Sequence, residues 1–248
     1  MLNGIDPRGP KDLDKKAIKQ VNDQLIEEIA RLQRLLYAEQ KHSVLIVLQG
    51  LDAAGKDGAI RSIFSAVNPL GCKVHAFKKP TEEEFGHDFL WRVHKRVPQK
   101  GMIHIFNRSH YEDILVPSVE GYFSKETINA RFDHINNFER LLEDGGTKIL
   151  KFYLHISKHE QLERLTERLE NPEKHWKHND GDWESRKKWE SYMNVYEEIF
   201  KRCNEVPWHI VPSDRNWVKV NYIANVLLDT LKGLNSKWPG LETERFKK

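Results

Sequence analysis

Short apolar segments alternate with longer amphipathic segments along the chain. Five mostly apolar runs have the length of strands, and a segment of helical length separates each run from the next. Such runs are typical of parallel strands, because helices bury both faces of a parallel sheet. The pattern predicts an α/β fold built on a five-stranded parallel sheet. The predicted strands span residues 44–49, 72–77, 102–107, 149–156 and 208–212.

The amphipathic segments are the predicted helices. Residues 13–41 contain no Pro or Gly, and Ile18, Leu25 and Leu32 belong to an apolar series at helical spacing. This long helix covers either its own sheet or a partner chain. The other predicted helices span residues 56–67, 86–97, 124–143, 158–170, 182–202 and 216–232.

Two segments fall outside this alternation. Residues 1–12 are polar and contain Pro7 and Pro10, which predicts a flexible N-terminal arm. Residues 171–182 are polar, carry helix breakers and lie between two charged helices. This second segment is either a solvated connection or a mobile lid over a ligand.

Composition narrows the class of protein. The 248 residues suffice for one α/β domain with a large core. A net charge of +3 does not by itself require a nucleic-acid partner, and we expect none. The two cysteines, Cys72 and Cys203, form no zinc pattern and fit a reducing compartment. Without a signal-peptide pattern or an apolar run near the ~20 residues of a membrane span, a soluble cytoplasmic protein is expected.

A candidate phosphate-binding loop follows the first predicted strand. The stretch QGLDAAGKDG places Gly50, Gly55 and Lys56 at the spacing G-x-x-x-x-G-K-[ST]. The glycines let successive backbone N–H groups point at one anion, and the following helix adds the positive end of its dipole. The strand before the loop and the amphipathic helix after it support this interpretation. The predicted loop residues are Gly50, Ala53, Ala54, Gly55, Lys56, Asp57 and Gly58.

Two acids distinguish this loop from the usual pattern. Asp57 stands where a Ser or Thr hydroxyl usually holds Mg²⁺, and Asp52 lies inside the loop. Carboxylates repel phosphate unless a cation lies between them, and Mg²⁺ prefers oxygen ligands. We therefore predict that Asp52 binds the metal. Asp57 either assists it or stabilises the helix N-terminus through its charge.

A second polar cluster, IFNRSHYED, follows the third predicted strand. The strand ends at Asn107, which offers an oxygen but no charge, so we predict Asp113 as the second metal ligand. Arg108 at the strand end is predicted to face the transferring phosphoryl group, where a planar cation suits spreading charge. In the alternative interpretation, Arg108 and Asp113 merely pair with each other.

Basic residues gather beyond the loop. Ligands of parallel sheets bind outside the carboxyl ends of the strands, which favours Lys78 and Lys79 as binding residues. Arg92 and Arg96 share one stripe of the next predicted helix, and the alternative for them is a solvated face.

Further arginines lie on the helix before the polar segment. Arg164 and Arg168 are spaced i, i+4, and Lys177 follows within the segment. These cations either close onto phosphate or, for the arginines, form helix-stabilising pairs with Glu160 and Glu163.

The loop, the polar cluster and two later stretches form four distinctive blocks. The blocks read GLDAAGKDG, IFNRSHYED, NPEKHWKHNDGDWESRKKWESY and VPWHIVPSDRNWVKVNYI. In this order they resemble the second family of polyphosphate kinases, from about residue 40 to residue 232. The resemblance implies a thymidylate-kinase-like P-loop fold, an α/β/α sandwich with a helical lid. We therefore expect one domain over residues 13–235, with its lid at about 160–185, and a C-terminal tail over 236–248.

The resemblance also implies an activity. Members of this family move a phosphoryl group reversibly from inorganic polyphosphate to a nucleotide with Mg²⁺, for which Mn²⁺ is an alternative, and they form homodimers or homotetramers. Many members read FDRSWYNR where this chain reads FNRSHYED. That departure resembles the class III subgroup, which accepts both AMP and ADP, and it leaves guanine acceptors open. It supports Asp113 as the displaced metal ligand and suggests Glu112 near the nucleotide.

Carried over position by position, the resemblance assigns roles to the candidate residues. Lys56, Arg108, Asp52 and Asp113 are the expected catalytic residues, with Asp52 and Asp113 holding the metal. The expected residues for polyphosphate and nucleotide binding are Lys78, Lys79, Arg92, Arg96, Asn107, Glu112, Arg168 and Lys177.

Two competing hypotheses remain. An ATP-dependent P-loop kinase of a nucleoside monophosphate or another small molecule would share the loop and the lid. A nucleotide-dependent switch or a polyphosphate-binding protein would bind these ligands without turnover, and Asn107 in place of an acid keeps this hypothesis open.

Overall fold

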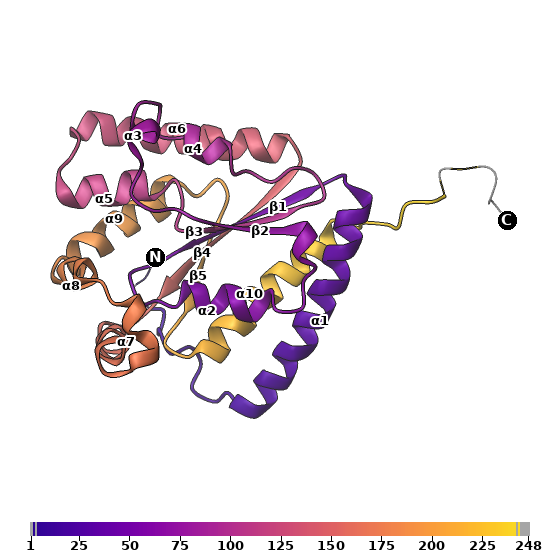
Figure 1. The fold of residues 1–248 in the computed structure, drawn as a ribbon, viewed down its shortest axis with the longest axis horizontal. Helices are drawn as coiled ribbons and strands as arrows, with labels where there is room; N and C mark the ends of the chain where they lie inside the picture. The colour runs from indigo at the N-terminus through magenta and orange to yellow at the C-terminus, as the bar shows by residue number, and fades with distance from the viewer. Residues whose placement is uncertain (1, 3, 242, 244–248) are drawn as a thin grey trace.

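A five-stranded parallel sheet forms the centre of the computed structural model, which describes residues 2, 4–241 and 243 (Figure 1). The strand order is β2-β3-β1-β4-β5, and every neighbouring pair is parallel. The sheet therefore has the predicted strand number and direction. The strands are β1 (Ser43–Gln49), β2 (Cys72–Ala76), β3 (Ile103–Asn107), β4 (Thr147–His155) and β5 (Trp208–Pro212).

Helices cover both faces of this sheet. The α-helices are α1 (Lys15–Glu39), α2 (Lys56–Ile63), α3 (Glu82–Phe85), α4 (Trp91–His94), α5 (Glu112–Glu120), α6 (Lys125–Asp144), α7 (Lys158–Glu170), α8 (Asp180–Lys187), α9 (Trp189–Arg202) and α10 (Asn216–Gly233). Two 3₁₀ helices are η1 (Pro69–Gly71) and η2 (Pro172–Lys177). Helices α1, α2 and α10 cover one face, and α5, α6 and α9 cover the other (Figure 1). The predicted three-layer sandwich is confirmed.

Some predicted helices differ from the observed ones. Of the predicted helix over 86–97, the short helix α4 (Trp91–His94) is observed; a separate helix, α3, starts earlier at a Thr81–Glu84 capping box and ends before Gly86. The predicted helix over 182–202 is broken at Lys188, whose backbone (φ −97°, ψ 22°) separates α8 from α9. Helix α5 was not predicted, since its first residues looked like a polar loop.

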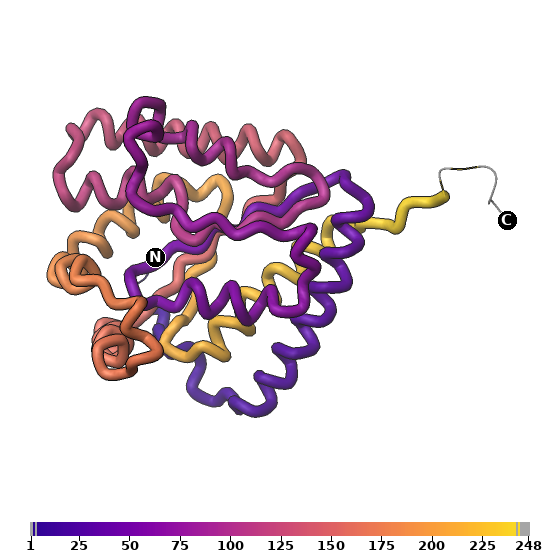
Figure 2. Tube along the Cα trace, in the orientation of Figure 1, coloured from indigo at the N-terminus to yellow at the C-terminus, as the bar shows by residue number. Residues whose placement is uncertain are grey.

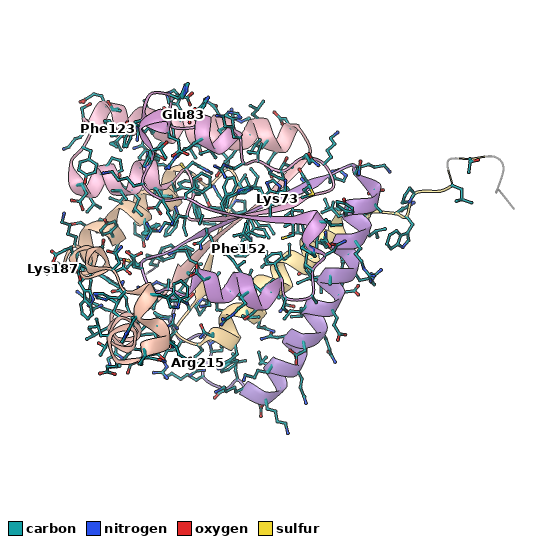
Figure 3. The ribbon with its side chains drawn as sticks, viewed as in Figure 1. Lys73, Glu83, Phe123, Phe152, Lys187 and Arg215 are labelled. Carbon is teal, nitrogen blue, oxygen red and sulfur yellow. The ribbon has the colours of Figure 1, made fainter. Side chains whose placement is uncertain are left out.

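The core lies where β1 runs between β3 and β4. Every residue of β1 is buried, so apolar side chains occupy both faces of the central strand. Phe152 of β4, labelled at the centre of Figure 3, is fully buried between the layers. The register pairs Leu48 with Asn107 and also with Phe152, so β1 and β3 end side by side. The segments after Gln49 and after Asn107 consequently emerge at the same edge of the sheet.

The long helix α1 packs on its own chain. Its apolar stripe, which includes Leu25, Ile29 and Leu36, is buried on the side that faces α10. Asn22 within this stripe donates to the Trp217 carbonyl at 3.0 Å. Of the two alternatives for this helix, the structure therefore shows contact with its own domain.

The two ends of the chain differ. In the predicted arm, the Leu2 side chain is buried and its N–H donates to Glu197 at 2.7 Å, while the Pro7 carbonyl accepts from the Asp214 N–H at 3.0 Å. At these points the arm is packed, contrary to the loose segment expected; residues 1 and 3 lie outside the described residues. The described part of the predicted tail leads away from α10 (Figure 2), and residues 242 and 244–248 are not described. Within the described part of the chain, no helix is long and apolar enough to cross a membrane.

Candidate active site

The phosphate-binding loop connects β1 to α2 at the carboxyl edge of the sheet. Its backbone takes left-handed conformations at Ala53 (φ 62°) and Gly55 (φ 90°). A Cβ at Gly55 would lie 2.3 Å from the Lys219 Nζ, so only glycine fits there. Gly50 also approaches β4 closely, since a Cβ there would lie 3.0 Å from the Leu154 carbonyl oxygen. Both glycines of the motif are thus required by the geometry of the loop.

Lys56 lies inside this loop. Its ammonium donates to the Gly50 carbonyl at 2.8 Å and to the Leu51 carbonyl at 3.3 Å. Burial and then the Arg108 guanidinium lower the pKa of Lys56, and the neighbouring acids Asp52 and Glu112 oppose that shift. Two backbone carbonyls of the loop therefore hold the ammonium of Lys56, and both the Arg108 cation and the Asp52 and Glu112 carboxylates lie near it.

Arg108 follows β3 and lies between two acids. Its backbone is left-handed (φ 62°), which turns the side chain back toward the loop. The guanidinium donates to the Asp52 carboxylate at 2.5 Å and lies 3.8 Å from the Glu112 carboxylate. Glu112 is the largest cause of the raised pKa of Arg108. These partners, rather than the alternative partner Asp113, place Arg108 beside the phosphate loop.

Asp113 lies in a different environment from Asp52. Its carboxylate accepts from the Arg92 guanidinium at 3.1 Å, and its carbonyl accepts from Arg131 at 2.5 Å. The structure therefore does not bring the two predicted metal ligands together. The physical reason is that α5 begins at Glu112, and successive residues of a helix point about 100° apart. Glu112, not Asp113, shares a cavity with Asp52.

The other loop acid has a specific partner. Asp57 accepts a hydrogen bond from the Asn107 side-chain amide at 2.7 Å. Asp57 also lies in the first turn of α2, as the helix-dipole alternative supposed. The amide of Asn107 thus joins the end of β3 to the start of α2, a role that an acid at this position could not fill without a proton or a cation.

A cavity of about 250 Å³ opens between the loop and the helices beyond it. Acidic, basic and aromatic side chains all line it. Its lining residues are Gly50, Leu51, Asp52, Arg108, Glu112, Leu115, Val116, Glu120, Tyr122, Gln161, Ser185, Arg186, Trp189, Tyr192 and Tyr196. The hydroxyl of Tyr196 is buried and has no hydrogen-bond partner within the described structure. The cavity therefore offers charged groups, aromatic rings and a spare polar group.

The predicted basic residues form a second, smaller cavity after β2. Lys78, Lys79, Arg92 and Arg96 all line this space of about 170 Å³. Arg92 is 6% exposed and already occupied, because it donates to the Lys78 carbonyl at 2.9 Å as well as to Asp113. Among the described residues that line this cavity, Lys78, Lys79 and Arg96 are the cations without an ion pair like that of Arg92 with Asp113.

The polar segment after α7 folds into η2 and α8. Arg168 joins its two ends, donating to the Asp182 carboxylate at 2.6 Å and to the Lys177 carbonyl at 3.1 Å. The Lys177 ammonium lies over the Trp176 ring, 4.9 Å from its centroid. Burial and then Asp52 raise the pKa of Asp182, so this segment lies within electrostatic reach of the loop. The labelled Lys187 marks the outer side of α8 in Figure 3.

Several contacts of the loop were not anticipated from the sequence. Gln161 and Arg164 of α7 and Lys219 of α10 each donate to a carbonyl of the loop. Arg164 does form the expected i, i+4 pair with Glu160, at 2.8 Å, in addition to this contact. A signal for Lys219 existed, because a lysine between Val218 and Val220 on a buried helix face needs a polar partner.

Comparison with known proteins establishes the family. The family model described as Polyphosphate kinase 2 (PPK2) matches residues 12–238. This chain belongs to the polyphosphate kinase 2 family. The resemblance drawn from the four sequence blocks is thereby confirmed at the level of the family.

Relatives of this polyphosphate kinase 2 chain include enzymes with different acceptors. The AMP/ADP-polyphosphate phosphotransferase of Meiothermus ruber is 49% identical over 221 residues, which cover 88% of this chain and 83% of that protein. The ADP-polyphosphate phosphotransferase of Rhodopseudomonas palustris is 39% identical over 237 residues, covering 90% of this chain and 82% of the relative. Sequence similarity therefore extends over nearly the whole kinase domain.

The fold is shared with solved members of the family. A crystal structure of polyphosphate kinase 2 from Arthrobacter aurescens TC1 superposes with a TM-score of 0.94 at 40% identity. The superposition covers 98% of this chain and 89% of that one. The predicted α/β kinase fold with its phosphate loop is confirmed.

Proposed function

We propose that this polyphosphate kinase 2 transfers a phosphoryl group from inorganic polyphosphate to AMP and ADP, yielding ADP and ATP in a reversible reaction. The observation that carries the proposal is the meeting of Lys56 and Arg108 beside one phosphate loop, in a chain 49% identical to an AMP/ADP-polyphosphate phosphotransferase. Two cations and the loop amides lie together, and such groups stabilise the negative charge on a phosphoryl group during its transfer.

The chain's own residues stabilise charge and position the two polyanions. Lys56 and the loop amides bind the phosphates, and Arg108 accommodates charge that spreads over the transferring phosphoryl group. The acceptor oxygen belongs to an ionised phosphate, so no general base is required. Alignment of donor and acceptor then supplies most of the acceleration.

The acids of the site fit a divalent cation. No group of three or more His, Cys, Asp and Glu side chains that could hold a metal occurs in the described parts of the chain. Mg²⁺ needs only one or two carboxylates, because it keeps waters and binds substrate phosphates. Asp52 and Glu112 line one cavity and would hold it, whereas the predicted ligand Asp113 does not line that cavity. The chemistry that Mg²⁺, or Mn²⁺ in its place, would supply there is neutralisation of negative charge on the substrate phosphates.

The acceptor end of the site supports the class III assignment. Glu112 and Asp113 replace the Asn-Arg pair of many family members, and Glu112 lies in the cavity that continues to Trp189, Tyr192 and Tyr196. Aromatic rings can stack on a base, and the unpartnered Tyr196 hydroxyl can hydrogen-bond to the nucleotide. A relative from Corynebacterium glutamicum that carries the name putative GDP-polyphosphate phosphotransferase is 33% identical over 223 residues, so guanine acceptors form an arm of the test.

Polyphosphate is a flexible anion without bases, so charge alone can bind it. Lys78, Lys79 and Arg96 line the cavity after β2 and would hold the chain as it leaves the phosphate loop. Arg92 supports this surface through the Lys78 carbonyl. Assembly into a homodimer or homotetramer and a cytoplasmic location stay predictions.

Product analysis tests the proposal. We expect AMP with long-chain polyphosphate and Mg²⁺, without ATP, to yield ADP and then ATP, and expect excess EDTA to stop the reaction. Parallel arms contain ADP, GMP or GDP as acceptor. Formation of ADP from AMP only when ATP is the donor would instead support an ATP-dependent kinase, and binding of both ligands without any product would support a non-enzymatic role.

A further inference from the structure

Three successive carbonyls of the phosphate loop are each held by a different side chain. The Asp52 carbonyl accepts from the Gln161 amide at 3.0 Å, and the Ala53 carbonyl accepts from Arg164 at 3.0 Å. The Ala54 carbonyl accepts from the Lys219 ammonium at 3.1 Å. Two of these donors come from α7 and one from α10.

Holding a carbonyl fixes the amide of the same peptide group. In a trans peptide the C=O and the following N–H point in opposite directions. The contact to Asp52 therefore orients the N–H of Ala53, and the contact to Ala54 orients the N–H of Gly55. The Ala54 N–H is used within the loop, donating to the Leu51 carbonyl at 3.1 Å. The donors behind the loop thus determine which amides remain to face an anion.

The donor to the Ala54 carbonyl, Lys219, is a buried side chain with few possible partners. Lys219 is fully buried and also donates to the Asn216 side chain at 2.9 Å. Its Nζ occupies the space beside Gly55 that a Cβ would fill. Burial, and then Arg164 and Lys56, lower the pKa of Lys219 to about 7. A buried amine whose charged form is disfavoured is thus placed directly behind the phosphate loop, and it donates to the Ala54 carbonyl there.

The same contacts reach the polar segment over the site. Arg186 of α8 donates to the Gln161 side-chain oxygen at 2.8 Å and to the Lys158 carbonyl at 2.8 Å. Gln161 therefore accepts from α8 and donates to the loop, which links the two through one side chain. Arg164 additionally holds the Ser213 carbonyl at 2.8 Å, so the segment before α10 is tied to the same point.

We propose that Gln161, Arg164 and Lys219 are positioning residues that set the amide orientation of the phosphate loop, with Gln161 coupling that orientation to α8. The proposal rests on the proposed function, because the oriented amides serve the transferred phosphoryl group. Arg164 and Lys219 do not line the cavity beside Asp52, whereas Gln161 does and acts through its contact with the Asp52 carbonyl. Their effect is on the geometry in which Lys56 and the loop amides meet the phosphates.

The test compares two variants of the full-length protein with a matched control. Lys219→Met removes one donor, and Gln161→Glu keeps the acceptor for Arg186 while removing the donor to Asp52. Lys232→Met makes the first change on an exposed position of the same helix. We expect kcat to fall on the order of 10²-fold in Lys219→Met, the scale of a displaced reacting group, with the nucleotide KM changed less than about threefold.

Hydrogen–deuterium exchange of the peptide spanning residues 50–58 supplies a second readout. We expect faster exchange in this peptide in Lys219→Met and Gln161→Glu, at unchanged exchange in β1 and β4, and no change in Lys232→Met. Normal kcat and normal loop exchange in both variants would overturn the proposal. A kcat loss explained entirely by a lower folded fraction would do the same. If Lys219→Met does not fold, the exchange of the peptide spanning residues 50–58 in Gln161→Glu decides whether the proposal stands.

The two proposals fail in different ways. A wild-type protein that forms no nucleotide product from polyphosphate refutes the proposed function, whereas loop exchange still measures the three contacts. An active wild type whose loop exchange and kcat do not respond to the substitutions refutes only the positioning role.

Discussion

Lys151 is a buried cation whose three hydrogen-bond donors are all used. It donates to Glu139 at 2.7 Å, to the Tyr111 hydroxyl at 2.8 Å and to the Cys203 carbonyl at 3.0 Å. Tyr111 in turn donates to Glu139 at 2.8 Å. The network joins β4, α6 and Tyr111, which lies between Arg108 and Glu112 in the sequence. It therefore fixes the backbone that carries these two site residues.

Removal of this cation alone should be costly. Lys151→Met leaves the Glu139 carboxylate buried without its charged partner, and we expect a loss of about 3–5 kcal/mol in the free energy of unfolding. The double variant Lys151→Met/Glu139→Leu removes both charges and should lose clearly less. Urea unfolding of the three proteins measures the difference. Equal losses in the single and double variants would show that the ion pair is not what the fold depends on.

The residues of the site were predictable where a local pattern defines them. Lys56 follows from the spacing of the glycines, and Arg108 from its place at a strand end. The position of Glu112, rather than Asp113, beside Asp52 was not predictable, because a shift of one residue in the phase of α5 decides which of the two acids faces the cavity. The partner of Lys219 lies 165 residues away in sequence, and no local pattern contains such a contact.

At the scale of elements, the ion pairs of Lys174 with Glu167 and of Arg168 with Asp182 hold the segment η2–α8 against α7. Arg168 and Asp182 are 16% and 12% exposed in their side chains, and their charged groups lie 2.6 Å apart. Two roles for Arg168 are compatible with this contact. In one role, Arg168 stabilises the packing of η2–α8 on α7 through its ion pair with Asp182. In the other, Arg168 breaks this ion pair during turnover and binds phosphate itself.

Two neutral variants separate these roles. If Arg168 binds phosphate during turnover, we expect Arg168→Gln to lower kcat/KM on the order of 10²-fold, as removal of one charged donor does elsewhere. Asp182→Asn frees the arginine and should retain activity within about threefold. Steady-state kinetics with polyphosphate as the varied substrate measures both. Equal losses in the two variants would assign Arg168 a structural role only.

The elements themselves were predicted best in the core. The strands were predictable because apolar runs of strand length recur between amphipathic segments, and parallel pairing follows from that order. The helices α3 and α5 were not, and α4 forms only part of the helix predicted over 86–97, since each is short or starts among polar residues that also suit loops. Their boundaries depend on capping contacts and on packing across the sheet rather than on a local period.

At the scale of the whole molecule, the strand order brings distant segments to one edge. Because β1 lies between β3 and β4, the phosphate loop, the Arg108 segment and α7 all begin at the carboxyl ends of adjacent strands. This is the edge at which parallel sheets bind ligands. The fold therefore accounts for a single site assembled from segments more than 100 residues apart. One example is the contact between Gln161 and Asp52, which are separated by 109 positions in the sequence.

The rate of ATP formation from ADP and polyphosphate in a Lys56→Met variant tests the central claim most directly. Lys148→Met is the matched control, because Lys148 is exposed on β4 near the opposite end of the sheet. The account predicts ATP formation by the wild type and the control, and a rate lower by on the order of 10²-fold or more in Lys56→Met. Undiminished ATP formation by Lys56→Met would contradict it.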